Sequence, residues 1–478
     1  MIKISAKYKN SFIAVSLIAV FILLFSFASY QKKDTLSTSL INKEIILSGG
    51  ETTVFDQSVN AFALPAPGLS SQDELLFFVG NSFFNQNWVQ APSSTTARDG
   101  LGPYFNAKSC SGCHFKDGRG QPPTIAGQLS QVFIIRLSIP GKGPHGEPLD
   151  DPNYGGQFQE HAIDGLKKEG DYTLNWEEIT DNYPDGNSFV LRKPIINFGE
   201  LNYGEMQQGI MYSPRVAPQM IGLGLLEAIE EKTILSFADV NDKNGDGISG
   251  KPNYVWNAID QKVQLGKFGW KANQPTILQQ ISGAFSGDMG ISTDHFPEQN
   301  IASSQNKYRD YATGGEPEIE KDDLHKLHLY SSTLAVPARR NVDDKDVMKG
   351  EKIFAEIGCD NCHIQKIQTG VHAEFSILSN QTITPYTDLL LHDMGEGLAD
   401  GRPDFEATGQ EWRTPPLWGL GLSPNSQGGQ YFLLHDGRAK SIEEAILLHG
   451  GEGQQSKERF QQLSVQEKNS LIKFLKSL

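Results

Sequence analysis

The chain has 478 residues, which is long enough for two or three domains that each bury a core. Its 42 basic and 57 acidic side chains give a formal net charge of -15. This acidic balance argues against binding to nucleic acid, and it leaves room for a basic partner protein. The 24 prolines and the hydrophobic content of 38% fit a globular chain with many loops.

The first 28 residues have the pattern of an export signal. Lys3, Lys7 and Lys9 precede an apolar run over residues 11–28, whose end resembles a small-x-small cleavage site. The run is also long enough to remain as an uncleaved membrane anchor. In either case we expect the rest of the chain in the periplasm or cell envelope. Residues 29–69 are expected to form a polar linker.

Apolar spacing and turn residues predict the next elements in chain order. A first α domain is expected over residues 70–130 with parts of 200–335. Residues 131–200 are expected to form a β-containing insertion, with strands over 132–137 and 188–192. A helix is predicted over 220–230. A second α domain over 340–478 opens with a helix over 347–357 and closes with helices capped by Ser441 and Ser464.

All four cysteines lie in two copies of one pattern, Cys110-Ser-Gly-Cys113-His114 and Cys359-Asp-Asn-Cys362-His363. C-x-x-C-H is typical of c-type haem attachment, because the two thiols can form thioethers with one haem while the histidine binds its iron. A dithiol would leave both histidines unexplained, and a shared zinc site would require two distant pairs to meet. The patterns therefore predict two covalent haems with His114 and His363 as proximal ligands. The predicted fold is mainly α, with two cytochrome c-like domains and an α+β insertion.

The sixth iron ligand decides between electron transfer and access of a substrate to the iron. For the second haem we expect His449, with His392 and Met394 as rivals, whereas His435 is expected to hold a loop. For the first haem no candidate stands out, so we expect an open, labile or solvent-occupied position. The possible ligands there are Met206, Met211, Met220, Met289, His145 and His161.

Asp242, Asn244 and Asp246 match the first half of a calcium-binding loop, but the twelfth position lacks the bidentate glutamate, so a structural Ca²⁺ is the hypothesis. Trp270, Trp412 and Trp418 are candidate electron relays between the haems, with core packing as the alternative. Arg119, Arg215 and Arg413 are candidate anchors for haem propionates. Glu227 is a candidate acid or base for peroxide chemistry, or a buried group with a structural partner.

The chain resembles the bacterial diheme oxidoreductase family, whose members are also described as diheme peroxidases and labelled thiol oxidoreductases. The resemblance covers about residues 70–478. The matching stretches are 102–120, 221–228, 246–250, 268–272, 288–290, 391–395, 413–418 and 435–451. The thiol label finds no support here, because no cysteine lies outside the haem motifs.

The C-terminal part is also similar to diheme cytochrome c peroxidases and to diheme enzymes that mature a tryptophan cofactor. In the peroxidases, the position that matches His449 is the methionine ligand of the electron-transfer haem. The resemblance implies reduction of hydrogen peroxide at the N-terminal haem, with electrons that come from a small cytochrome or another redox protein and enter through the C-terminal haem. A non-catalytic electron-transfer cytochrome and an enzyme that oxidises a protein partner are the alternatives.

Overall fold

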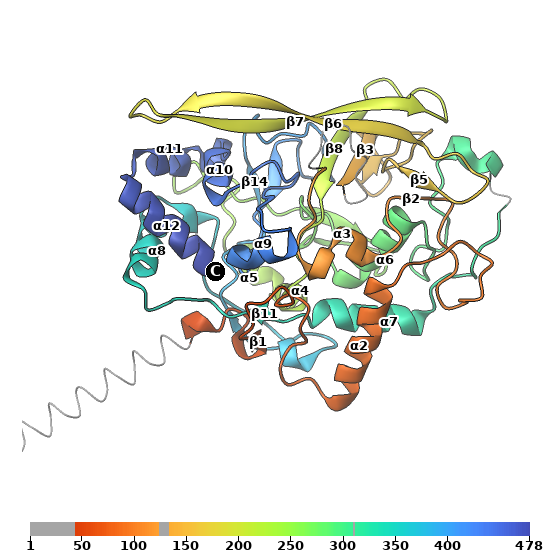
Figure 1. The fold of residues 1–478 in the computed structure, drawn as a ribbon, viewed down its shortest axis with the longest axis horizontal. Helices are drawn as coiled ribbons and strands as arrows, with labels where there is room; N and C mark the ends of the chain where they lie inside the picture. The colour runs from red at the N-terminus through yellow and green to blue at the C-terminus, as the bar shows by residue number, and fades with distance from the viewer. Residues whose placement is uncertain (1–43, 124–132, 309–310) are drawn as a thin grey trace, which may run out of the picture. The chain divides into compact units, whose positions relative to one another are not determined.

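The computed structural model describes residues 44–123, 133–308 and 311–478 (Figure 1). The chain divides into two units, Met1–Ile46 and Leu47–Leu478. Only residues 44–46 of the first unit are described, and they are helical. The predicted export signal and most of the predicted linker lie outside the described residues. Within the described ranges, no helix has the length and apolar character needed to cross a membrane.

The fold class is mixed α/β, with 29% helix and 20% strand distributed over many small sheets. The predicted mainly α class is therefore wrong. The helical spacing near the two cysteine motifs was a local signal, and it does not extend to the stretch between them. That stretch contains the longest strands of the described chain.

The helices of the second unit are mostly short. The α-helices are α2 (Ser71–Asn85), α3 (Cys110–Cys113), α4 (Leu223–Glu227), α5 (Glu231–Leu235), α6 (Ile277–Met289), α7 (Lys321–Ser332), α8 (Lys345–Glu356), α9 (Ser423–Ser426), α10 (Ile442–Leu447), α11 (Gln454–Gln462) and α12 (Val465–Ser477). The 3₁₀ turns are η1 (Gly50–Thr52), η2 (Phe115–Asp117), η3 (Ser303–Tyr308), η4 (Cys359–Asn361), η5 (Ser376–Leu378), η6 (Leu420–Leu422) and η7 (Gly451–Gly453).

The strands pair mostly as two-stranded ladders. They are β1 (Thr53–Val54), β2 (Tyr104–Phe105), β3 (Phe133–Lys142), β4 (Pro148–Leu149), β5 (His161–Ala162), β6 (Gly170–Asn182), β7 (Ser188–Leu201), β8 (Met211–Val216), β9 (Tyr254–Asn257), β10 (Lys262–Leu265), β11 (Val336–Pro337), β12 (Ile367–Gln368), β13 (Thr382–Ile383), β14 (Leu391–Asp393) and β15 (Glu411–Arg413).

Each cysteine motif follows a helix that packs closely on a second helix. In the first half α2 packs on α7, and a Cβ added at Gly80 would lie 2.3 Å from the carbonyl oxygen of Lys326. In the second half α8 packs on α12, and a Cβ added at Gly350 would lie 2.0 Å from the carbonyl oxygen of Ser470. Glycine therefore permits the close helix contact in both halves.

The predicted helix caps of the C-terminal part are confirmed. The Ser464 hydroxyl accepts the N–H of Glu467, and the Glu467 carboxylate accepts the N–H of Ser464, which is a complete capping box for α12. The Ser441 hydroxyl accepts the N–H of Glu444 and begins α10. The helix predicted over 220–230 is shorter in the structure, because Gly222 has a left-handed φ of 69° and α4 begins only after it.

The insertion is dominated by the long antiparallel hairpin β6–β7. Figure 1 shows this ribbon extending from the region of β2 and β5 to that of α10 and α11. Leu174 and Ile196 pack into a core cluster with β3, while the Tyr183 hydroxyl near the tip donates to Glu443 of α10 over 2.7 Å. The hairpin thus contacts both the β3 region and the C-terminal helices. The predicted domain boundaries within Leu47–Leu478 stay predictions.

Strand β3 lies between β4 and β8 and orients side chains by alternation. Phe133, Ile135 and Leu137 are buried in one core cluster, while Ile134 and Arg136 turn to the opposite face. That opposite face borders the first of the two cavities described below.

Candidate haem sites

The first cysteine motif lies against a cavity of about 570 Å³, within the size range of cofactor sites. Helix α3 carries Cys110 and Cys113, and His114 follows it directly. The His114 Nδ1–H donates to the carbonyl oxygen of Pro218 over 2.8 Å, which leaves Nε2 free to bind a metal. Burial lowers the pKa of His114 to about 4, so its imidazole is neutral, as iron ligation requires.

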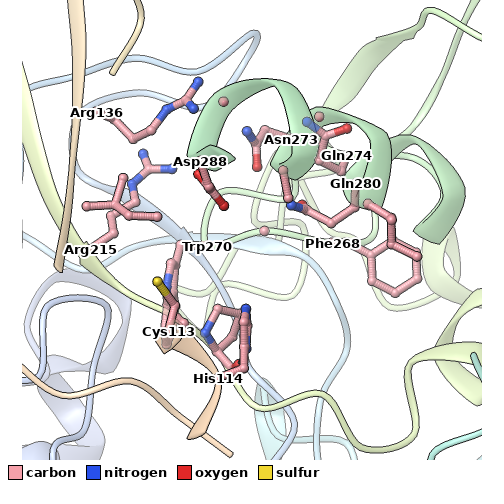
Figure 2. A pocket seen from close by; sticks show the side chains of 18 of the residues that line it. Cys113, His114, Arg136, Arg215, Phe268, Trp270, Asn273, Gln274, Gln280 and Asp288 are labelled. Atoms are coloured by element: carbon pink, nitrogen blue, oxygen red, sulfur yellow. The ribbon is translucent and has the colours of Figure 1, made fainter. Parts of the chain in front are cut away.

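Helix α6 forms the opposite wall of this cavity. Gln280 and Asp288 lie eight residues apart on one face of α6, and Figure 2 shows them across the cavity from Cys113 and His114. Asp288 accepts a hydrogen bond from the amide of Gln157 over 2.9 Å, and burial raises the pKa of its carboxyl. Neither side chain was predicted as a site residue from the sequence. Their spacing on a predicted helix was the available signal.

Arginines border the same cavity. The guanidinium of Arg215 is buried and forms long ion pairs, from Nη2 to Asp400 over 3.7 Å and from Nη1 to Asp404 over 3.6 Å, and its Nη2 has no hydrogen-bond partner. The Nε of Arg136 also lacks a partner. Buried guanidinium groups that keep an unused N–H donor beside a cavity fit the carboxylates of haem propionates. Arg136 was missed in the sequence, although strand alternation in β3 turns it towards the cavity.

Two other predicted anchors are largely occupied by backbone groups. Arg119 donates to the carbonyl oxygens of Phe432 and Leu434, over 3.3 Å and 2.7 Å. Arg413 donates to Gly269 and Thr414. Both arginines still line the first cavity, but their hydrogen bonds connect distant segments of the chain.

The second motif lines a separate cavity of about 200 Å³. Cys359 is the first residue of η4 and Cys362 follows this turn directly, and the Nδ1–H of His363 donates to the carbonyl oxygen of Tyr386 over 2.9 Å. Burial lowers the pKa of His363 to about 4. This cavity is smaller than the ~300–1,000 Å³ of most cofactor sites, so a haem here would displace some lining side chains. The ligand chemistry nevertheless fits, since Nε2 of a neutral imidazole is available.

His449 lines the second cavity together with His363. It lies just after α10, and its Nδ1–H donates to the carbonyl oxygen of Ala445 over 2.6 Å, so its Nε2 is available. The rival His392 is engaged at both ring nitrogens, by Glu452 at 2.5 Å and Asp388 at 2.8 Å. The structure therefore favours His449 over His392 as the sixth ligand.

The other candidates at the second cavity are Met394 and His435. Met394 lines the cavity as well, so it remains a rival of His449 for the sixth position. The His435 ring stacks on Trp412 at 3.7 Å between ring centroids, and burial lowers its pKa to about 3. Its backbone carbonyl accepts the N–H of Val216, which ties this loop to β8.

Trp270 lies in the wall between the two cavities and lines both. Its indole N–H donates to the carbonyl oxygen of Val216 over 2.8 Å, and the guanidinium of Arg119 lies 5.0 Å from its ring centroid. Trp412 lines only the second cavity, and Trp418 is buried in the core and lines neither. Of the three predicted relay candidates, the structure brings Trp270 to the shared wall.

The predicted acid or base Glu227 lies outside both cavities. Its carboxylate accepts the N–H of Ile277, the first residue of α6, over 2.8 Å, and it lies 3.2 Å from Nε2 of His372. Burial would raise the pKa of Glu227, but the hydrogen bond with His372 lowers it below the ordinary value. These contacts fit the alternative that Glu227 is a buried group with a structural partner.

The candidate sixth ligands of the first haem separate clearly. Met220 and Met289 line the first cavity, whereas the remaining candidates do not; these are Met206, Met211, His145 and His161. His145 instead stacks on Trp256, with 3.9 Å between ring centroids. Among the described residues that line this cavity, His114 is the only histidine.

The predicted calcium loop is exposed. Its side-chain oxygens cap backbone groups of the loop: Asp242 accepts from Gly247, Asn244 from Asp246, and Asp246 from Ile248. The described groups of histidine, cysteine and acidic side chains close enough to hold a metal ion lie elsewhere. Calcium binding at Asp242, Asn244 and Asp246 stays a prediction.

Comparisons with known proteins identify the family. A family described as "Di-haem oxidoreductase, putative peroxidase" matches residues 43–138 and 145–478. No curated protein is significantly similar to the chain. A solved structure of hydrazine synthase from Kuenenia stuttgartiensis, pressurised with xenon, aligns over 87% of this chain and 94% of its own, with 13% identity and a TM-score of 0.31. The family match spans nearly the whole chain, and the protein therefore belongs to the di-haem oxidoreductases with peroxidase-like character.

Proposed function

We propose that the protein is an exported diheme c-type cytochrome that reduces hydrogen peroxide at the first haem site with electrons that enter through the second. The observation that carries this proposal is the asymmetry of the two cavities. The second cavity contains two histidines whose Nε2 atoms are available, His363 and His449. The larger first cavity contains His114 opposite a carboxyl and an amide, Asp288 and Gln280. Such polar groups suit a small polar substrate better than a permanent sixth ligand.

Covalent attachment is part of the proposal. In each motif the two cysteine S–H groups would add to the two vinyl groups of one haem, one thiol to each vinyl group, and so form two thioethers. Both motifs lie against a cavity with the histidine immediately after the second cysteine. The histidine rings are already oriented by backbone carbonyls, so ligation requires no change of tautomer.

The residues of the first cavity can manage the protons of peroxide reduction, which consumes two protons and two electrons and gives two water molecules. A bound haem would supply the electrons and the iron at which the O–O bond is cleaved. Asp288 is the group that we assign to proton transfer, because it lines the cavity opposite His114 and burial raises the pKa of its carboxyl above the ordinary value. Gln280 can donate its amide N–H to an oxygen atom held between α6 and His114.

The proposed donor is a small cytochrome or another redox protein with a basic surface. The chain carries a net charge of -15 before haem propionates are counted, and complementary charge accelerates the encounter of two redox proteins. Export to the periplasm or cell envelope rests on residues 1–28 and on the c-type motifs, since haem is attached to such motifs outside the cytoplasm.

A non-catalytic electron-transfer cytochrome is the second candidate. Met220 and Met289 line the first cavity, and a thioether on the iron would close the site to peroxide. Absorption and electron paramagnetic resonance spectra of the exported protein, before and after peroxide, distinguish the two functions. A high-spin signal that peroxide abolishes supports the peroxidase, whereas two unreactive low-spin haems support the electron carrier.

The role of Asp288 is tested by steady-state peroxide reduction with a reduced small cytochrome as donor. We expect Asp288→Asn to lower kcat about 10²- to 10⁴-fold, the usual contribution of a general acid or base. The matched control is Asp164→Asn, a change of an exposed carboxyl outside both cavities. Equal kcat values for Asp288→Asn and the wild type would show that Asp288 does not transfer protons in the reaction.

A further inference from the structure

A group of histidine and carboxylate side chains lies outside both haem cavities. His325 and His328 are three residues apart on α7 and so face the same side of the helix. Glu374 approaches them from the segment between β12 and η5. Its Oε2 lies 3.8 Å from Nδ1 of His325 and 3.5 Å from Nδ1 of His328. One ligand atom from each residue lies within 4.8 Å of the other two.

These distances are close to those of a metal site. Zinc binds imidazole nitrogen at about 2.0–2.1 Å and carboxylate oxygen at about 2.0–2.2 Å, so two ligands of a tetrahedral ion lie about 3.4 Å apart. The two distances from Glu374 exceed this value by only a few tenths of an ångström. The ligand nitrogens of His325 and His328 lie within 4.8 Å of each other, so side-chain rotations would bring all three ligand atoms to one ion.

The burial of the three side chains also suits an ion. His328 is only 4% exposed, and its Nδ1, the ring nitrogen that faces Glu374, lies 3.5 Å from that carboxylate. The side chains of His325 and Glu374 are 49% and 45% exposed. The group is thus anchored on the inside and open to solvent on the outside, which provides an entry path.

His372 holds the segment that carries Glu374 in place, and both of its ring nitrogens are engaged in hydrogen bonds. Its Nδ1 accepts the backbone N–H groups of Glu374 and Phe375, each over 3.1 Å. The proton must then be on Nε2, which lies 3.2 Å from the Glu227 carboxylate and donates to it. Phe375 packs its ring near both His372 and His328, at 5.2 Å and 5.3 Å between ring centroids. The position of Glu374 is therefore fixed by the turn that precedes it.

We propose that His325, His328 and Glu374 bind one Zn²⁺ ion, with the fourth position open to solvent. Two imidazoles and one carboxylate are a ligand set that zinc accepts, and three protein ligands leave one tetrahedral position for water. Calcium and magnesium prefer oxygen ligands throughout, so they are poor occupants of a site with two nitrogen ligands.

The ion would connect α7 to the segment after β12 at the back of the first haem cavity. Leu327 and Ser331 of the same helix line that cavity. The neighbouring Glu227 holds the first N–H of α6, which forms the opposite wall. Zinc at this position would thus fix a wall of the cavity from outside, without contact with the haem or its substrate.

Metal analysis of the untagged, exported diheme protein tests the proposal. After treatment with a chelator, the protein is dialysed against Zn²⁺ in the presence of a weak competing chelator, and zinc is counted against the two irons. We expect one zinc per two irons, with zinc–nitrogen and zinc–oxygen distances near 2.0–2.1 Å by X-ray absorption at the zinc edge. No stoichiometric zinc in the wild-type protein would overturn the proposal.

Variants assign the ligands. His325→Ala and Glu374→Gln change half-exposed side chains, so the protein is expected to fold, and each should weaken zinc binding at least about tenfold. His328→Ala should do the same, with its haem absorption recorded to verify folding. The matched controls are His295→Ala and Glu356→Gln, which remove a histidine and a carboxylate elsewhere and should keep wild-type affinity. Equal affinity of the wild type and both exposed variants would refute the site.

Discussion

His363 and His449 line the same cavity, and each donates its Nδ1–H to a backbone carbonyl oxygen, of Tyr386 and Ala445 respectively. Both Nε2 atoms are therefore available to bind a metal, although the two residues are far apart in the sequence. A histidine at each axial position gives a lower reduction potential than a histidine and a methionine. A second haem with a low potential holds its electron less tightly, so it suits the role of electron donor to the first haem.

Replacement of His449 tests this ligation. We expect His449→Met to raise the midpoint potential of the second haem by a clear part of the ~0.8 V range that axial ligands control. His449→Ala should convert this haem from low to high spin. Redox titration and electron paramagnetic resonance measure both effects. The control His145→Ala removes a ring that stacks on Trp256 outside both cavities, and it should leave the spectrum unchanged. An unaltered low-spin signal in His449→Ala would mean that Met394, and not His449, is the sixth ligand.

The glycine contact between α8 and α12 makes a prediction about stability. In Gly350→Ala the new Cβ would lie 2.0 Å from the carbonyl oxygen of Ser470, so the two helices must separate. We expect a loss of about 1–3 kcal/mol in the free energy of unfolding, as for other overpacked cores. Urea unfolding of the diheme protein measures it. At Gly397 an added Cβ meets no atom within 4 Å, so Gly397→Ala is the matched control. Equal unfolding midpoints for the two variants would contradict the close contact.

Features that depend on a few adjacent residues could be predicted from the sequence, whereas features that depend on contacts between distant segments could not. The cysteine motifs, the caps at Ser441 and Ser464, and the candidate ligand His449 can be identified from a few adjacent residues. The structure confirms both caps, and it places the second motif and His449 at one cavity. The mainly α fold was wrong because β6 and β7 form a long hairpin of which only residues 188–192 were predicted as a strand. Strand β6 is largely polar, and β7 continues past Arg192 through Pro194 to Leu201. The hydrophobic pattern of β6 was too weak for a strand to be predicted there.

The polar side of the first cavity could not be predicted for a different reason. Asp288, Gln280 and Arg136 come from α6 and β3, and only the tertiary fold brings them to one space (Figure 2). Glu227 is the opposite case. Its position in an apolar run made it a candidate acid or base, but its carboxylate lies outside both cavities and forms hydrogen bonds with the Ile277 N–H and with His372. Sequence patterns identify which residues can do chemistry, but the distances between distant segments decide which of them meet.

A buried acid in the insertion predicts a pH dependence of stability. Glu160 is 3% exposed, and burial raises its pKa to about 8, although the Tyr172 hydroxyl 3.5 Å away partly offsets this. The unfolded chain loses this proton near pH 4.3, so the folded state binds the extra proton between about pH 4.3 and 8. Stability contributed by protonated Glu160 is thus complete below about pH 4.3 and is lost as the pH rises through 8.

Glu160→Gln removes this titration and keeps a hydrogen-bonding side chain. We expect the variant to lack a decline of on the order of 1.4 kcal/mol per pH unit that the wild type shows between the two pKa values. Urea unfolding at several pH values from 5 to 9 measures the difference. Glu178→Gln, which changes an exposed carboxylate on β6, should follow the wild type. Parallel curves for Glu160→Gln and the wild type would mean that Glu160 is ionised in the folded protein.

Trp270 is the side chain through which we expect electrons to pass between the sites, because its ring lines both cavities. Trp270→Phe keeps an aromatic ring but removes the indole N–H that donates to Val216 over 2.8 Å. We expect slower electron exchange between the haems while both midpoint potentials stay at wild-type values. Flash reduction followed at the two haem absorption bands measures the rate. Trp418→Phe makes the same chemical change at a buried ring that lines neither cavity, so its rate should equal that of the wild type. If Trp418→Phe slows the exchange as much as Trp270→Phe does, the effect is a consequence of core packing and Trp270 has no special part in electron transfer.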